Sequence, residues 1–387
     1  IPTVDRVRSF LADPGPDKRS RLIDELLASP AHARHFALLL DAMLLERKAP
    51  AAEMAAAWRE FLMTAVATDR PLDQVCGDCL ASDGGDPATR PAAAFFFARE
   101  AEPVQMTRSI GRIFFGRDLQ CAQCHDHPNN ADIRQADYYG LNAFLARTSL
   151  FKAEGDPQPF LGEKADGEVE YTSVFTKEGQ KGVRPRVPFG ATLAIEPLQE
   201  SADQYTTVPA KNVRGVPSHS RRRALAGMLA ESVEFRRTMA NRLWATMNGR
   251  GLVHPLDGLD PDNTPTHPEL LALLADTLRT DGFHLRPILR GIALSRTYQR
   301  SVEPPAFPAE TLAGLPSLID QLVGLRGQQE AAIAPLEAAA KEAEARFAAI
   351  LSADGQVLGE LPPLIEARNK ARGTADTTAA AKKAAEE

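Results

Sequence analysis

Two cysteine pairs carry the clearest chemistry in this sequence. Each has the spacing Cys-x-x-Cys: Cys76 with Cys79, and Cys121 with Cys124. The second pair is followed directly by His125, which completes the sequence Cys-Ala-Gln-Cys-His. In c-type haem attachment, two thiols at this spacing bond the two vinyl groups and the next histidine coordinates the iron. The sequence therefore predicts a covalent haem c on Cys121 and Cys124, with His125 as the proximal ligand.

The four cysteines also allow two other interpretations. Together they supply the ligand set of a four-thiolate zinc site, in which His125 or His127 can replace one thiolate. Disulfides in an exported protein, within each pair or between the pairs, are the other interpretation. No histidine follows Cys79, so the first pair suits zinc or a disulfide better than haem. The alternative zinc ligands are Cys76, Cys79, Cys121 and Cys124.

The sequence leaves the second axial ligand of a haem iron open. Met106 lies on the apolar face of an expected helix, where we expect a core residue rather than a ligand. His127 is only two residues from His125, too close to reach the opposite side of the same iron. A five-coordinate iron would favour binding of peroxide or a diatomic gas over simple electron transfer.

Two clusters of polar residues accompany the motif. The first follows it directly and predicts a turn, with orientation of His125, binding of the haem propionates or binding of a second metal as the alternatives. Its members are Asp126, His127, Asp132 and Asp137. The second is expected to form a buried Arg–Asp network between two parts of the chain, with a substrate pocket as the alternative. Its members are Asn241, Arg242, Trp244, Asn248, Arg250, His254, Asp257, Asp260 and His267.

Helical periodicity dominates the chain, so the sequence predicts a mainly α, multidomain protein. Apolar residues recur at helical spacing through residues 1–70, and again at 104–115 and 136–146 on either side of the haem motif. Leucines spaced by three and four among Ala, Glu and Lys predict a C-terminal helical hairpin or coiled coil, broken near residues 352–359. The expected regions are a helical domain at 1–150, a small β-rich insert at 151–216, a helical partner domain at 217–301, and a tail at 302–387 whose Pro-rich linker extends to 317.

Charge and hydropathy exclude some classes of protein. The net charge of −6 argues against a general nucleic-acid binder. No run of 18 apolar residues occurs, so we expect no transmembrane helix. No Ser-His-Asp signature, phosphate-binding Gly loop or His-Glu-x-x-His motif occurs either, so we assign no catalytic residue.

The residues around the motif resemble a family of planctomycete cytochrome-C-like domains of unknown function, which a partner domain of unknown function usually follows. The resemblance to the first domain rests on 1–11, 22–30, 115–128 and 135–144. The resemblance to the partner domain rests on 241–253, 266–271 and 292–299. Three features depart from the family pattern: Ile1 suggests a truncated start, Cys76 and Cys79 are a local addition, and the region after Pro304 does not resemble the partner domain.

The resemblance implies a periplasmic or otherwise exported protein. The motif, the cysteine pairs and the tail leave three functional hypotheses. The first is a redox protein with covalent haem that exchanges electrons with a partner protein or acts on a small oxidant. The second is a structural or scaffold protein whose cysteines bind zinc or form disulfides, with self-association through the C-terminal helices. The third is an oxidoreductase with a substrate pocket between the two family-like domains. The intact Cys-x-x-Cys-His motif favours the first.

Overall fold

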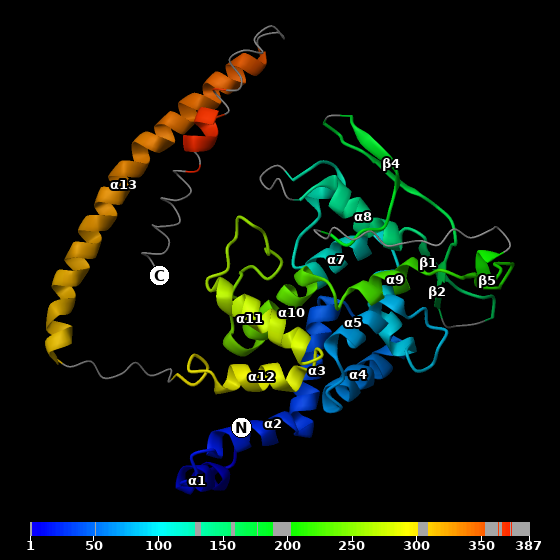
Figure 1. The fold of residues 1–387 in the computed structure, drawn as a ribbon, viewed down its shortest axis with the longest axis horizontal. Helices are drawn as coiled ribbons and strands as arrows, with labels where there is room; N and C mark the ends of the chain where they lie inside the picture. The colour runs from blue at the N-terminus through cyan, green and yellow to red at the C-terminus, as the bar shows by residue number, and fades with distance from the viewer. Residues whose placement is uncertain are drawn as a thin grey trace. The chain divides into compact units, whose positions relative to one another are not determined.

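A computed structural model describes residues 2–50, 52–127, 133–155, 159–175, 177–188, 203–300 and 309–352, together with 363, 366–371 and 373. The chain divides into two compact units, Ile1–Arg300 and Ser301–Glu387. Helices make up most of the described structure, and the strands form only small two-stranded sheets (Figure 1). The predicted mainly α fold is confirmed.

Along the chain, the helices of the first unit come before and after a stretch that contains the strands (Figure 1). Those before it are α1 (Val4–Ala12), α2 (Lys18–Leu27), α3 (Pro30–Leu45), α4 (Ala52–Ala67), α5 (Leu72–Ala81), the 3-10 helix η1 (Arg90–Ala93), α6 (Ala94–Phe97), α7 (Pro103–Phe115), the 3-10 helix η2 (Cys121–Gln123) and α8 (Gln135–Leu145). Those after it are α9 (Arg221–Met228), α10 (Val233–Asn248), α11 (Pro268–Thr280) and α12 (Leu285–Leu294). None of the described helices is both long and apolar enough to cross a membrane.

Local sequence signals set the ends of the helices around the motif. Glu102 accepts hydrogen bonds from the first backbone N–H groups of α7, and Pro103 occupies its first position, where no N–H is needed. At the other end Gly116 has a φ of +64°, the left-handed conformation that closes a helix and favours glycine. A Cβ at Gly116 would lie 2.7 Å from the Oγ1 of Thr238 on α10. This glycine therefore lets α7 end against α10 and directs the chain toward the motif.

One hydrophobic core extends across the two family-like regions. The rings of Phe95 and Phe114 lie 5.5 Å apart, centroid to centroid, and that of Phe114 lies 6.2 Å from Phe235 on α10. Phe235 in turn lies 6.0 Å from Phe283, so aromatic contacts cross the sequence boundaries expected at 150 and 217. Buried side chains of α3 to α8 and α9 to α12 belong to a single cluster. The regions predicted as separate domains thus form one compact unit.

In the described part of the insert, the strands form three antiparallel pairs. They are β1 (Thr148–Phe151) with β2 (Phe160–Glu163), β3 (Val169–Thr172) with β4 (Gly179–Val183), and β5 (Tyr205–Thr207) with β6 (Val216–Pro217). Thr148 pairs with Glu163 and Phe151 with Phe160 in the first ladder, whereas the other two ladders contain register shifts. A small β-rich insert is therefore present, as the alternating stretches predict.

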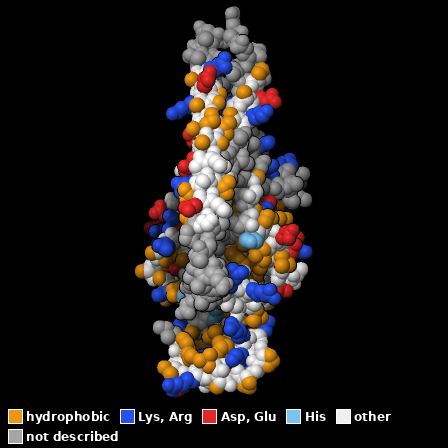
Figure 2. All heavy atoms as spheres, turned by 90° about the vertical axis from the view of Figure 1, so that its left-hand side faces the viewer, with side chains coloured by type: hydrophobic (Ala, Val, Ile, Leu, Met, Phe, Trp, Pro, Cys, Tyr) orange, Lys and Arg blue, Asp and Glu red, His pale blue; other side chains and the backbone are white. Residues whose placement is uncertain are grey.

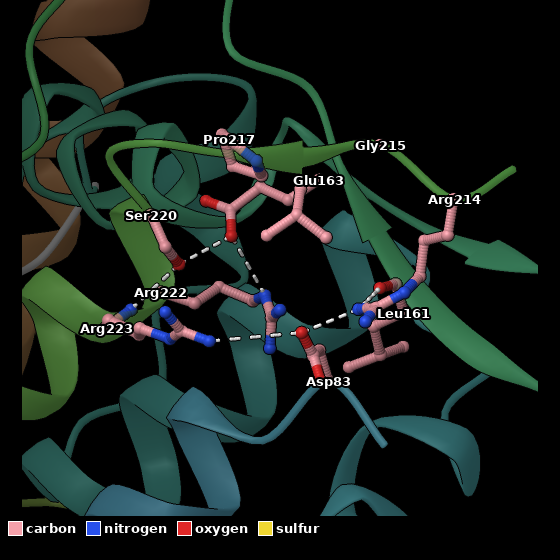
Figure 3. A pocket seen from close by; sticks show the side chains of 10 residues that line it. Asp83, Leu161, Glu163, Arg214, Gly215, Pro217, Ser220, Arg222 and Arg223 are labelled. Carbon is pink, nitrogen blue, oxygen red and sulfur yellow. Dashed lines mark hydrogen bonds and ion pairs between the residues drawn. The ribbon is translucent and has the colours of Figure 1, made fainter. Parts of the chain in front are cut away.

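A buried ionic cluster joins the insert to the helices (Figure 3). Glu163 at the end of β2 accepts hydrogen bonds from the Ser220 hydroxyl at 2.6 Å and from the Arg221 N–H at 2.7 Å. The guanidinium of Arg222 lies 3.5 Å from Glu163 and donates to the carbonyls of Leu80 and Ser82 at the end of α5. Removal of one partner would leave a buried charge uncompensated. The cluster therefore fixes β2, α5 and α9 in position relative to one another.

The second unit contains α13 (Ala309–Ser352). The predicted linker at 302–317 is too long, because α13 already begins at Ala309. Its first seven residues include two Ala, two Leu and one Glu, which are strong helix formers, and the helix continues through Pro316. The described part of α13 extends to Ser352, residues 366–371 are helical, and the predicted break near 352–359 lies outside the described residues apart from Ser352 itself. Hydrophobic and charged side chains are interspersed along α13 (Figure 2).

Candidate functional site

The Cys-x-x-Cys-His motif forms one tight 3-10 turn between α7 and α8. The backbone N–H of Cys124 donates to the carbonyl of Cys121 at 3.2 Å, and the N–H of His125 donates to the same carbonyl at 3.4 Å. Both thiols are free and exposed. The turn therefore presents two solvent-accessible sulfur atoms and an imidazole from five consecutive residues.

The two residues between the cysteines hold this turn in place. Ala122 is fully buried in the hydrophobic core. The carbonyl of Gln123 accepts a hydrogen bond from the Tyr139 hydroxyl at 2.9 Å, and its side-chain oxygen accepts one from Arg108 at 2.5 Å. Asp126, after the motif, accepts from the backbone N–H of Gln135, the first residue of α8, at 2.8 Å. The backbone is thus fixed on both sides while the cysteine side chains stay at the surface.

The imidazole of His125 is oriented by its own backbone neighbour. Its Nδ1 lies 2.7 Å from the carbonyl of Asp126, so the tautomer that satisfies this contact carries the proton on Nδ1. The Nε2 atom then keeps its lone pair, which is the state that a metal-coordinating histidine needs. Beside this ring lies an open pocket of about 490 Å³, whose wall also includes Tyr171 and Phe175.

The β3–β4 hairpin is part of the site, although no sequence signal placed it there. Its turn is bound to the motif by a hydrogen bond of 3.1 Å from the Val174 N–H to the Cys124 carbonyl. The Phe175 ring lies 4.8 Å from that of His125, at an interplanar angle of 43°. Tyr171 stacks on Tyr139 at 4.7 Å and 12°, and burial raises the pKa of both tyrosines. The insert therefore supplies one wall of the pocket.

The first cysteine pair lies elsewhere. Cys76 and Cys79 are on α5, fully buried in the hydrophobic core, where burial raises the pKa of both thiols. Within the described ranges, no three His, Cys, Asp or Glu side chains form a group that could hold a metal ion. The two pairs differ in placement, because α5 is a core helix whereas the Cys121–Cys124 turn is at the surface, so the described residues do not assemble the four-cysteine zinc site. A disulfide within each pair stays a prediction.

Other predicted residues near the motif have structural roles. Met106 is fully buried in the hydrophobic core, as its helical face predicts. Asp137 accepts from the backbone N–H of Arg134 at the start of α8 and pairs with Arg186 at 2.9 Å. Asp126 orients His125 through its backbone carbonyl rather than its side chain. Asp132 lies outside the described residues.

The second polar cluster joins the two parts of the chain. Arg242 on α10 donates to the carbonyl of Arg112 on α7 at 2.8 Å, and Arg117 lies 3.9 Å from Asp260. The Asn241 side chain exchanges two hydrogen bonds with the backbone of Val253. Trp244 belongs to the core, as expected. The cluster therefore joins the two parts mainly through hydrogen bonds to the backbone, with the Arg117–Asp260 contact as its Arg–Asp pair among the described residues.

Family comparisons agree with this organisation. Residues 1–149 match the PSCyt2 family, described as a protein of unknown function (DUF1549). Residues 221–312 match the PSD1 family, also described as a protein of unknown function (DUF1553). The chain carries a PSCyt2 domain followed by a PSD1 domain. The Cys-x-x-Cys-His turn lies in the PSCyt2 part, and the strand pairs of the insert, including the β3–β4 wall of the site, lie mainly between the two matched parts. No curated protein and no solved structure matches the chain.

Proposed function

We propose that this PSCyt2–PSD1 protein is an exported c-type haem protein with a redox role. The observation that carries the proposal is the turn at Cys121–His125, in which two exposed free thiols stand beside an imidazole oriented through Nδ1. Cys121 and Cys124 would form the thioether bonds, and His125 would bind the iron through Nε2. A bound haem would supply one-electron redox chemistry, which none of these side chains provides alone.

The surroundings of the turn fit such a group. The pocket beside His125 measures about 490 Å³, within the range of about 300–1,000 Å³ that small-molecule and cofactor sites occupy. Tyr171 and Phe175 provide aromatic surface on its wall, while its open side faces solvent. A surface-exposed redox centre suits electron exchange with a partner protein, and an open pocket also gives access to a small oxidant.

The structural alternative has less support from the geometry. A zinc site would need thiolates from both pairs, yet one pair is in the core and the other at the surface. Self-association through α13 remains a separate proposal, supported by the exposed apolar residues Ile319, Leu322 and Val323. Replacing Leu322 and Val323 by glutamate should lower the molar mass measured by light scattering if α13 carries an interface. An unchanged mass, with the wild type already monomeric, would reject that interface.

The haem proposal is tested with full-length protein exported from a host with cytochrome c maturation. A pyridine haemochrome spectrum should show a c-type haem in the wild type. The double variant Cys121→Ser/Cys124→Ser should lose covalent haem, whereas the matched variant Cys76→Ala/Cys79→Ala should keep it. A wild type without the c-type band, carrying about one zinc per chain, would reject the proposal in favour of zinc. Haem loss in both variants, with both folded, would mean that the pairs act together.

A further inference from the structure

A second pocket lies between the two family-matched parts of the chain. It measures about 250 Å³ and is lined mainly by apolar residues of α3 and α10, including Phe36, Leu40, Met239 and Leu243. Helix α3 belongs to the PSCyt2 part and α10 to the PSD1 part. This pocket shares no lining residue with the pocket beside His125, so nothing assigned above occupies it.

The charged side chains that line this pocket are all of one sign. Among the described residues that line it, Arg47 and Arg242 are the charged ones, and no carboxylate joins them. Such a lining favours an anionic group over a neutral or cationic one. The apolar walls in turn favour a ligand whose remaining surface is hydrophobic.

Arg242 is incompletely satisfied. Its Nη2 donates to the carbonyl of Arg112 at 2.8 Å, but its Nε is buried without a hydrogen-bond partner. Burial lowers the pKa of this guanidinium, although the carboxylates of Asp257 and Glu46 oppose the shift. Because this Nε has almost no solvent-accessible surface, a ligand in the pocket would meet the rest of the Arg242 side chain, which lines it.

Arg47 lies at the exposed edge of the same pocket. It follows the end of α3 in the left-handed conformation, with a φ of +63°. Its side chain makes no hydrogen bond or ion pair with the described residues. A ligand in the pocket would thus meet one buried guanidinium and one exposed guanidinium.

We propose that the α3–α10 pocket binds a small organic monocarboxylate with a compact apolar body. The carboxylate pairs with the guanidinium groups of Arg47 and Arg242, which both line the pocket, and the body contacts the apolar walls of both helices. The volume of about 250 Å³ equals that of about eight water molecules at about 30 Å³ each, which suits a ligand of the size of benzoate. Because the ligand touches both family-matched parts, its binding stabilises their association.

Calorimetric titration of the full chain with benzoate tests this proposal. We expect saturable binding with a Kd of about 1 mM or tighter. Benzamide, which has the same shape without the charge, should bind at least about tenfold more weakly, since it loses the charge-assisted hydrogen bond. Inorganic phosphate should also bind more weakly, because it has no apolar body. Equal binding of benzoate and benzamide, or no saturable binding of benzoate, would overturn the proposal.

Two variants and one control locate the site. Arg242→Met keeps the apolar stem and should weaken benzoate binding at least about tenfold. Ala42→Phe adds bulk at an exposed lining residue and should abolish binding without loss of the fold, so it decides the matter if Arg242→Met is unstable. Arg290→Met removes an exposed arginine outside the pocket and should leave the Kd unchanged. Unchanged affinity in Ala42→Phe would place benzoate elsewhere and refute the assignment.

Discussion

Replacement of Glu46 by alanine tests how the helix before the motif is held. Glu46 follows the end of α3 and accepts hydrogen bonds from Ser109 at 2.7 Å, Arg112 at 2.8 Å and Arg99 at 3.1 Å. Ser109 and Arg112 are on α7, which leads into the Cys-x-x-Cys-His turn. The Arg99 side chain is completely buried, so its charge depends on Glu46 for compensation.

The expected loss of stability follows from these contacts. Removing one partner of a buried ion pair costs about 3–5 kcal/mol, because the remaining charge stays buried without compensation. Glu46 keeps 25% of its side chain exposed, so we expect the lower end, about 3 kcal/mol for Glu46→Ala. Glu46→Gln retains an acceptor but not the charge, and should lose about 1–2 kcal/mol.

Urea unfolding of the full chain, followed by circular dichroism, measures both losses. Glu25→Gln is the matched control, since Glu25 pairs with Arg6 while 66% of its side chain is exposed. Such an exposed pair should give no measurable change. If Glu46→Ala lowers the free energy of unfolding no more than Glu25→Gln does, the cluster does not hold α7 in the way described.

Three further predictions concern acid stability, thiol access and the turn before the motif. Burial alone would raise the pKa of Asp83, but hydrogen bonds from Arg214 and the Gly85 N–H and the nearby arginine charges lower it below 3.8. The contribution of Asp83 to the free energy of unfolding is therefore present above about pH 4 and is lost as the pH falls through the lower folded pKa. Asp83→Asn should be less stable than the wild type at neutral pH, and the difference should shrink on acidification. A constant difference from pH 7 to pH 2 would contradict this. In haem-free protein, a maleimide should modify Cys121 and Cys124 under native conditions, and the buried pair Cys76 and Cys79 only after unfolding. Mass spectrometry of the peptides measures this labelling. Equal labelling of all four cysteines would refute the buried placement. Gly116→Ala should destabilise the fold by about 1–3 kcal/mol in thermal or urea unfolding. The reason is that alanine is strained at this positive φ and its Cβ would clash with Thr238. An unchanged midpoint would show that α7 and α10 can move apart without cost.

Sequence patterns could predict the helices of the PSCyt2 part because their ends are encoded locally. The hydrophobic periodicity of this segment predicts a helix at 104–115, and the observed α7 begins one residue earlier, at Pro103. The buried position of Met106 follows from the same periodicity. These features depend only on neighbouring residues, which a single sequence contains.

The arrangement of the site could not be predicted in the same way. The spacing of Cys121, Cys124 and His125 is local, but the hydrogen bond from Val174 to the Cys124 carbonyl joins segments 50 residues apart. The aromatic wall formed by Phe175 depends on the same long-range contact. Likewise the cysteine spacing alone could not show that Cys76 is in the core. The Cys-x-x-Cys spacing occurs in zinc sites, and a core helix also accepts two cysteines at this spacing.

The central claim is that haem is bonded covalently to Cys121 and Cys124, and peptide mass spectrometry tests it most directly. Full-length protein exported from a host with cytochrome c maturation is digested, and the peptide that spans Cys121 to His125 is examined. The account predicts that this peptide carries one haem through two thioether bonds, while the peptide with Cys76 and Cys79 carries none. A peptide in which Cys121 and Cys124 are free to react with an alkylating reagent, or are joined in a disulfide, would contradict it.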